Sequence, residues 1–307
     1  MVPSSPSPRR RSFLQLDVFA DQPQRGNPLA VVLDAEDLTD TDMARIAHWT
    51  NLSETTFLLA PTVPGADYRV RIWTPTGELP FAGHPTLGTA RAWLLAGGVP
   101  AGERIVQECA AGLITVRRTA ADGAPLGAGS ASLGADDGAS LAFAAPPLRP
   151  EGPLEDGEVA EIAAALGVDR SAVRGHAWAD NGPGWQVLEL EDAEQVLALR
   201  PDPVRLGDRK VGVLGWWGSG ARGAAGDAPL YEVRAFLPGG GEDPVTGSLN
   251  AGIGQWLVAR GEAPQRWTAA QGTVLGREGR IALEQDEDGT LWVGGVTVPT
   301  VQGTILA

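Results

Sequence analysis

Four polar side chains in this sequence are of the types that acid/base chemistry uses. Glu54 lies among apolar residues in the segment Asn51–Phe57, and a carboxyl group near apolar side chains can have the raised pKa that a general acid or base requires. His84, Asp243 and Ser248 lie in or next to two glycine-rich loops. Because histidine is the side chain best suited to proton transfer near neutral pH, these residues are candidates for general acid/base catalysis.

A purely structural role accounts for the same residues. Glu54 could be a surface glutamate at the start of a strand, and His84 and Ser248 could simply cap the helices that follow them. The spacing of the residues does not separate the two interpretations.

The two glycine-rich loops are equivalent parts of an internal repeat. The segments Tyr68–Pro75 and Tyr231–Pro238 begin 163 residues apart, and both alternate apolar and polar residues with period two, which predicts strands. The loops Gly77–His84 and Gly241–Ser248 follow, and each leads into a segment of helical periodicity that ends at glycine. The simplest explanation is two homologous lobes related by a pseudo-two-fold axis. Chance similarity between two Gly/Pro loops is the alternative.

Paired loops of this kind predict an anion-binding site. A glycine-rich loop that leads into a helix presents free backbone N–H groups and the positive end of the helix dipole. A pseudo-two-fold axis would bring both helix starts to one cleft between the lobes, where ligands commonly bind. We therefore expect a substrate carboxylate to be bound from both sides. Neither loop ends in the Gly-Lys-Ser/Thr of a phosphate-binding P-loop.

Periodicity predicts further elements and a division into two domains. The expected elements are a strand at Gln15–Phe19, a helix from Leu38 to about Trp49, a helix at Glu158–Leu166 and a hairpin that joins Ile281–Leu283 to Leu291–Val293. Residues 119–142 and 218–229 show no periodic pattern and are expected to be loops. The expected domains are a disordered tail at 1–11, an N-terminal lobe at 12–148, to which 298–307 could return, and a C-terminal lobe at 149–297.

Composition excludes several kinds of partner. The formal net charge of −14 repels phosphate backbones and anionic lipids, so we expect neither nucleic acid nor a membrane as a partner. No apolar run approaches the roughly 20 residues that span a bilayer. Arg9–Arg11 imitate an export signal, but Asp17 and Asp21 interrupt the apolar segment that such a signal needs. One cysteine, Cys109, fits a reducing compartment, and a cytoplasmic location is expected.

Together these segments resemble the PhzF-like isomerase family of phenazine biosynthesis. The matching segments run in order over nearly the whole chain: Asp17–Phe19, Gly26–Val32, Asn51–Phe57, Gly77–Gly88, Asp180–Pro183, Glu242–Ser248, Gln271–Gly272, Gly276–Arg280 and Trp292–Gly295. The glutamate segment and the Gly-His-Pro segment are specific to this family.

The resemblance implies a fold, a chemistry and an assembly. The implied fold is α+β and like that of diaminopimelate epimerase: two pseudo-symmetric lobes, each a curved mixed sheet around a central helix. A homodimer without metal or organic cofactor is also implied. By motif, Glu54 is similar to the family's proton shuttle, and the other polar site residues are His84, Asp243 and Ser248. The implied substrate contacts also include four residues: Asn27, Gly83, Thr246 and Gly247.

The resemblance also bears on the kind of isomerase. Racemases of the same fold use one thiol per lobe at the two helix starts, and Cys109 matches neither place. We therefore expect one carboxylate to shuttle a proton within a small carboxylate-bearing metabolite. A ligand-binding protein that lost catalysis, and an isomerase or cyclase acting on an unrelated secondary metabolite, are the alternatives. Four tryptophans could line an aromatic pocket, although core or interface positions are more common for this residue: Trp73, Trp185, Trp216 and Trp217.

Overall fold

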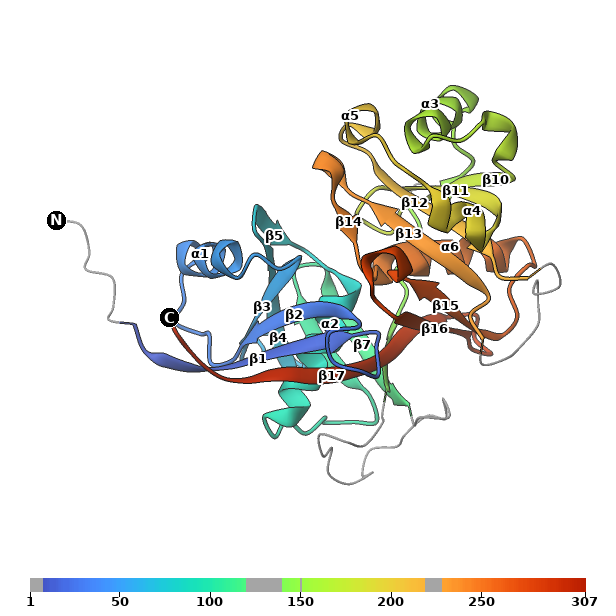
Figure 1. Cartoon of the computed structure of the whole chain (residues 1–307). Coiled ribbons are helices and arrows are strands. Elements are labelled where there is room, and N and C mark those ends of the chain that lie inside the picture. Colours follow the sequence, from blue (N-terminus) through green and yellow to red (C-terminus); the bar gives the residue numbers. More distant parts are fainter. Residues whose placement is uncertain (1–7, 120–139, 150, 219–227) are drawn as a thin grey trace.

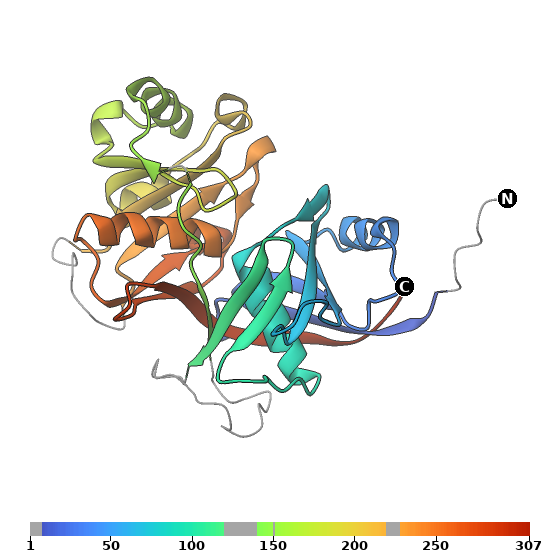
Figure 2. The same cartoon turned by 180° about the vertical axis from the view of Figure 1, so that it is seen from behind.

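Each half of the chain wraps a sheet around one helix. The computed structural model describes residues 8–119, 140–149, 151–218 and 228–307, and they form two lobes that lie side by side (Figure 1). One long strand runs along the base of both lobes, as the view from behind also shows (Figure 2). The predicted α+β class with two lobes is confirmed.

The N-terminal lobe is a closed barrel with a helix inside. Its elements are β1 (Arg10–Val18), β2 (Asn27–Val32), α1 (Asp40–Thr50), β3 (Glu54–Leu59), β4 (Tyr68–Thr74), β5 (Gly77–Leu79), α2 (Gly83–Leu95), β6 (Ile105–Cys109), β7 (Gly112–Thr119) and β8 (Ser140–Ala144). Strands β1, β2, β3, β4, β6, β7, β8 and β17 pair in that order and close between β17 and β1. Helix α2 packs against six of these strands and is therefore buried on nearly every side.

The C-terminal lobe repeats this plan with an open sheet. Its elements are β9 (Glu151–Gly152), α3 (Asp156–Leu166), η1 (Arg170–Ala172), β10 (Gly175–Ala179), β11 (Trp185–Asp192), α4 (Ala193–Ala198), α5 (Pro203–Leu206), β12 (Lys210–Trp216), β13 (Tyr231–Phe236), η2 (Pro238–Gly240), β14 (Glu242–Asp243), α6 (Gly247–Ala259), β15 (Arg266–Gln271), η3 (Thr273–Leu275), β16 (Gly279–Gln285) and β17 (Leu291–Leu306). Helix α6 takes the place of α2 and packs against β10, β11, β16 and β17.

The pairing of strands follows the same sequence in both lobes. In the first, β2 runs parallel to β3 and β4 runs parallel to β6. In the second, β11 runs parallel to β12 and β13 runs parallel to β15. The chain enters the central helix after β4–β5 in one lobe and after β13–β14 in the other. The pseudo-two-fold relation expected from the repeat therefore extends over whole lobes.

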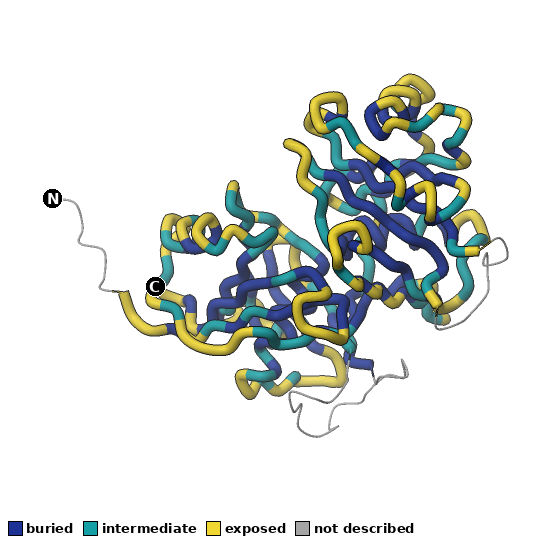
Figure 3. Tube along the Cα trace, in the orientation of Figure 1, coloured by how far each residue is buried: buried dark blue, intermediate teal, exposed yellow. Residues whose placement is uncertain are grey.

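Small residues let the central helices approach their sheets. A Cβ atom added at Gly88 in α2 would lie 2.4 Å from Leu29 Cδ2, and one at Gly252 in α6 would lie 2.3 Å from the carbonyl oxygen of Ala179. Neither distance is one that real Cβ atoms adopt. Both lobes therefore depend on glycine in the central helix, where it otherwise lowers helix stability. Buried residues follow the strands of both lobes (Figure 3).

Several predicted elements are confirmed and some boundaries are corrected. Helices α1 and α3 and the hairpin of β16 and β17 lie where they were expected. The first strand begins at Arg10 instead of Gln15 and ends before Phe19, whose φ of 67° does not suit a strand. It also includes two residues that were assigned to the tail.

The predicted loops are corrected in part as well. Residue 119 closes β7, and residues 140–142 belong to β8. Most of the remaining predicted loop, including part of the Gly218–Gly223 segment, lies outside the described residues.

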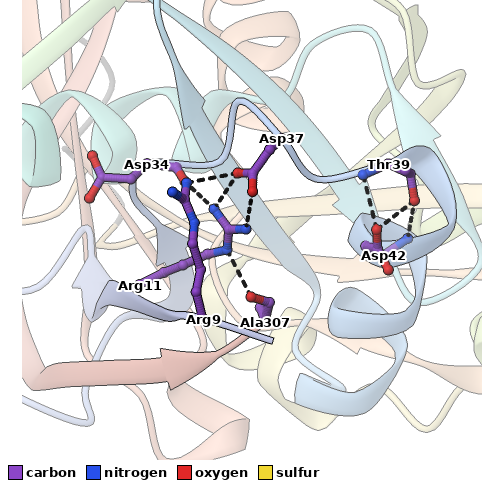
Figure 4. A network of polar contacts seen from close by, with 7 residues as sticks. All are labelled: Arg9, Arg11, Asp34, Asp37, Thr39, Asp42 and Ala307. Carbon is purple, nitrogen blue, oxygen red and sulfur yellow. Dashed lines mark hydrogen bonds and ion pairs between the residues drawn. The ribbon is translucent and has the colours of Figure 1, made fainter. Parts of the chain in front are cut away.

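The two ends of the described chain are held together by a buried arginine (Figure 4). Arg11 donates to both carboxylate oxygens of Asp37, at 2.7 and 3.0 Å, and to the carbonyl oxygen of Ala307 at 3.2 Å. It also donates to the carbonyl oxygen of Asp34. Hydrogen bonds from Arg11 lower the pKa of Asp37 to about 2. Because β17 pairs with β1 over residues 297–306, this cluster secures the strand pair that closes the barrel.

We predict that Arg11→Met destabilises the protein. The change removes charged hydrogen bonds from a side chain that is 3% exposed, and hydrogen bonds to charged groups contribute about 1.5–3 kcal/mol each. Urea unfolding should show a loss in that range. The exposed neighbour Arg10 makes one long side-chain contact, 3.4 Å to Thr304, so Arg10→Met is the matched control. Equal losses in the two variants would contradict the role assigned to Arg11.

Candidate active site

The two central helices meet at their N-termini. Helix α2 begins at Gly83 and helix α6 begins at Gly247. A Cβ atom added at Gly83 would lie 3.2 Å from the Cα of Gly247, and one added at Gly247 would lie 3.3 Å from the Cα of Gly83. The positive ends of two helix dipoles therefore converge at the junction of the lobes. We call the residues around this junction the inter-lobe site.

Among the residues that the structure describes, the backbone donors at this junction have no acceptor. The residues before the two helices are Ala82 and Thr246, and neither supplies a side-chain cap. The first helical hydrogen bonds are donated by Thr86 and Asn250. The earlier N–H groups, those of Gly83 and His84 in α2 and of Gly247, Ser248 and Leu249 in α6, have no acceptor inside their helices, and Pro85 has no N–H group. His84 and Ser248 do not cap their helices, and that alternative is wrong. Both first turns offer N–H groups to an anion.

Glu54 faces the first turn of α2. Its Oε2 atom lies 3.2 Å from Nε2 of His84, and the two side chains are 15% and 5% exposed. Burial, together with the charge of Asp243, raises the pKa of Glu54 to about 8, against an opposing effect of Lys210. Burial also lowers the pKa of His84 to about 3. At neutral pH the carboxyl group is therefore protonated and the imidazole is neutral, so the pair is not an ion pair.

Asn27 connects the histidine with the acid of the second lobe. Its Nδ2 lies 3.3 Å from Nδ1 of His84 and donates to Oδ1 of Asp243 at 2.9 Å and to the carbonyl oxygen of Val245 at 2.8 Å. The two N–H groups of this amide are directed to Asp243 and Val245, and the roles of the two nitrogens in the His84 contact depend on the tautomer of the imidazole. Nε2 of His84 is the ring atom next to Glu54.

Asp243 is positioned by the loop that leads into α6. Its Oδ2 accepts from the hydroxyl of Thr246 at 2.6 Å. Burial raises the pKa of Asp243 to about 6, and the hydrogen bonds from Thr246 and Asn27 oppose that rise. Asp243 and Glu54 therefore ionise in different pH ranges, so one can carry charge while the other holds a proton.

Residues outside the predicted set hold the second helix start. Gln271 accepts from the backbone N–H of Thr246 at 2.9 Å and donates to the carbonyl oxygen of Asp243 at 3.0 Å. Trp185 donates from Nε1 to the hydroxyl of Ser248 at 3.1 Å. Gln271 lies in a segment that carries the family resemblance, and Trp185 was a candidate for the aromatic pocket. No periodicity in the sequence indicates that either side chain lies near Ser248 or Thr246.

Three further features are the cysteine, possible metal ligands and membrane-spanning helices. Cys109 ends β6, and its Sγ lies 3.5 Å from the carbonyl oxygen of Gly112; it is not a residue of either helix start. Among the described residues, no three histidine, cysteine, aspartate or glutamate side chains are grouped so that they could hold a metal ion. No helix in the described part of the chain is long and apolar enough to cross a bilayer.

Comparisons with known proteins place this geometry in context. The family model for phenazine biosynthesis-like proteins, PhzC-PhzF, matches residues 16–303. Antisense-enhancing sequence 1 of Schizosaccharomyces pombe is 35% identical over 306 residues, and the match covers 97% of that protein and 95% of this chain. The trans-2,3-dihydro-3-hydroxyanthranilate isomerase of Pseudomonas aeruginosa is 33% identical over 273 residues, 88% of each chain. The solved structure of a predicted epimerase from the same organism superposes with a TM-score of 0.75 at 28% identity, and the match covers 97% of this chain and 99% of the other.

We predict that Gly83→Ala disrupts the junction of the two helices. The added methyl group would approach Phe143 Cζ to 2.7 Å and Gly247 Cα to 3.2 Å, and overpacking of this kind costs about 1–3 kcal/mol. The melting temperature should fall. Gly102, which has nothing within 4 Å of an added Cβ, provides the control variant Gly102→Ala. A melting temperature that falls no further in the first variant than in the second would contradict the close contact.

Proposed function

The chain belongs to the PhzC-PhzF family of phenazine biosynthesis-like proteins and is an isomerase, and on that premise we propose that Glu54 moves a proton within a small carboxylate-bearing substrate. The observation that carries the proposal is the Glu54–His84 contact of 3.2 Å, set against two converging helix N-termini. This contact puts the protonated carboxyl group of Glu54 beside the helix N-termini, where an anion can be bound.

The substrate carboxylate binds at the junction of the helices. The free N–H groups of Gly83, His84, Gly247 and Ser248 donate to its oxygens, and the helix dipoles favour its negative charge. Because the two first turns belong to different lobes, one carboxylate contacts both. The ligand is thereby oriented with its reacting carbons towards Glu54, and orientation of this kind lowers the entropic part of the barrier.

The proton transfer begins from the protonated carboxyl group. Glu54 donates its proton to one carbon of the substrate, and the resulting carboxylate removes a proton from another carbon. The carboxyl group is restored, so the reaction is an isomerisation and no proton is gained or lost. His84, with its proton on Nε2, donates to the Glu54 carboxylate while that charge exists, and Asp243 stabilises positive charge that develops on the substrate.

The relatives suggest a first substrate to test. The relative in Pseudomonas aeruginosa is named for its action on trans-2,3-dihydro-3-hydroxyanthranilate, which carries the carboxylate that this site would bind. Exchange with solvent separates the enzyme from a protein that only binds small acids. An enzyme introduces deuterium from D₂O into its substrate, whereas a binding protein of the same fold does not.

We predict that Glu54→Gln abolishes proton transfer while binding remains. The amide has nearly the same shape but cannot supply or accept the proton, and general acid/base catalysis contributes roughly 10²–10⁴-fold in rate. Deuterium incorporation from D₂O into trans-2,3-dihydro-3-hydroxyanthranilate and a panel of unsaturated hydroxy and amino acids should fall by that factor, as followed by mass spectrometry. Glu103, an exposed residue of the N-terminal lobe, provides the control Glu103→Gln. Full exchange by the Glu54 variant would remove this residue from its role.

The order of proton transfers predicts a pH dependence. Because the pKa of Glu54 is raised to about 8, the form that can donate a proton is present below that pH and is lost above it. The ratio kcat/KM should therefore fall as pH rises through about 8, since this ratio reports ionisation of the free enzyme. Circular dichroism at each pH, with recovery of activity at pH 7, controls for unfolding. A rate that increases through pH 8 would show that Glu54 acts first as a base.

A further inference from the structure

Lys210 is the only lysine in the chain, and nothing in the proposed reaction so far uses it. It is the first residue of β12 and is half-buried. The side chains of β12 alternate between two faces. Val211 and Val213 lie in the apolar cluster on the outer face, whereas Leu214 lies in the cluster that contains α6. Lys210 shares the face of Leu214, so it points to the side of the central helix.

Strand register makes Lys210 the counterpart of Glu54. Glu54 begins β3, and the following residue, Thr55, pairs with Trp73 of β4. Lys210 begins β12, and the following residue, Val211, pairs with Phe236 of β13. Trp73 and Phe236 are equivalent positions of the internal repeat, 163 residues apart.

The parallel neighbours of the two strands agree with this equivalence. Glu54 pairs with Leu29 of β2, and Lys210 pairs with Trp185 of β11. Glu54 lies against His84 in the first turn of α2, and Trp185, beside Lys210, contacts Ser248 in the first turn of α6. The pseudo-two-fold axis therefore relates a carboxyl group in one lobe to an ammonium group in the other.

The ammonium group lies near the site and is unpaired. Gly212 lies on the same face of β12 as Lys210, two residues further along. A Cβ atom added there would lie 2.4 Å from Cδ1 of Leu249, the residue that follows Ser248 in α6. Lys210 is also close enough to Glu54 to oppose the rise in the pKa of that carboxyl group. Within the described part of the chain its ammonium group makes no ion pair. Because Glu54 is protonated at neutral pH, it does not neutralise this charge.

We propose that Lys210 binds a second acidic group of the substrate, so that the substrate class is a small dicarboxylate. One carboxylate binds to the N–H groups at the two helix starts, and the other accepts hydrogen bonds from the ammonium group on the opposite side from Glu54. A lysine ammonium is a compact charge with three donors, which matches a single carboxylate. This inference rests on the proposed function, because it assumes that the substrate lies between Glu54 and Lys210.

Dicarboxylates and their monomethyl esters test the assignment, since each pair differs by one charge at nearly constant shape. The probes are glutarate, adipate and isophthalate, each compared with its own monomethyl ester by thermal shift and calorimetric titration. At least one dicarboxylate should bind the wild-type protein about 10- to 100-fold more tightly than its ester. Lys210→Met should remove that preference and Lys210→Arg should retain most of it. Arg209, which pairs with Glu161 of α3, provides the control Arg209→Met.

A second measurement uses the uniqueness of this lysine. Acetic anhydride can acetylate only one side-chain amine in this chain, because the chain has one lysine. A dicarboxylate that binds as proposed should slow acetylation of Lys210, and its monomethyl ester should protect less, as read by peptide mass spectrometry. Protection does not depend on the stability of a variant, so it remains informative if Lys210→Met folds poorly.

The outcomes separate this inference from the proposed function. It is overturned if no dicarboxylate is preferred over its ester by the wild-type protein, or if the preference survives Lys210→Met. The variant Glu54→Gln should keep the dicarboxylate preference while losing deuterium exchange. If Glu54→Gln exchanges normally but the preference depends on Lys210, the proton-shuttle role fails and the binding role stands.

Discussion

The contact between Gly83 and Gly247 is the constraint on which the rest of this structure depends. A Cβ atom added to either residue would lie only 3.2–3.3 Å from the Cα atom of the other, so the two helix starts come this close because neither residue has a side chain. Each helix is also enclosed by its own sheet, so neither can withdraw without loss of its core. The lobes therefore have to meet where two sets of N–H groups without helical acceptors lie together, and the proposed anion site rests on this packing.

Burial sets the ionisation of the side chains around that contact. Glu54, His84 and Asp243 come from different elements, β3, α2 and β14, and burial is the largest effect on the pKa of each. It shifts the pKa of both carboxyl groups upwards and that of the imidazole downwards, so Glu54 and His84 are neutral at pH 7. Asp243, with a pKa raised only to about 6, is mostly ionised at that pH. In the proposed site the helix dipoles and Lys210 therefore supply the attraction for an anionic ligand.

The two lobes share a fold but differ in chemistry at matching positions. His84 and Ser248 occupy the second residue of their helices, and Glu54 and Lys210 begin equivalent strands. A symmetric pair of identical groups would suit a reaction that removes a proton on one face of a carbon and returns it on the other. The pairing of an acid with a cation suits a ligand that reacts at one side and is held at the other.

The sequence alone determined the two lobes, the paired helix starts and most of the polar residues that lie at the inter-lobe site. Strand periodicity, the glycines that end helices and the internal repeat can be read directly from the sequence. The repeat is visible, for example, in the strands that begin at Tyr68 and Tyr231. Tertiary structure decided which polar groups meet. Asn27 reaches both His84 and Asp243, Gln271 holds the start of α6, and Lys210 matches Glu54 only through strand register. The segment that connects β12 to β13 is longer than the one that connects β3 to β4. The spacing between Glu54 and Lys210 is therefore 156 residues instead of the 163 of the repeat. The offset of the repeat therefore does not align Glu54 with Lys210, and their equivalence becomes visible only through the pairing of the strands.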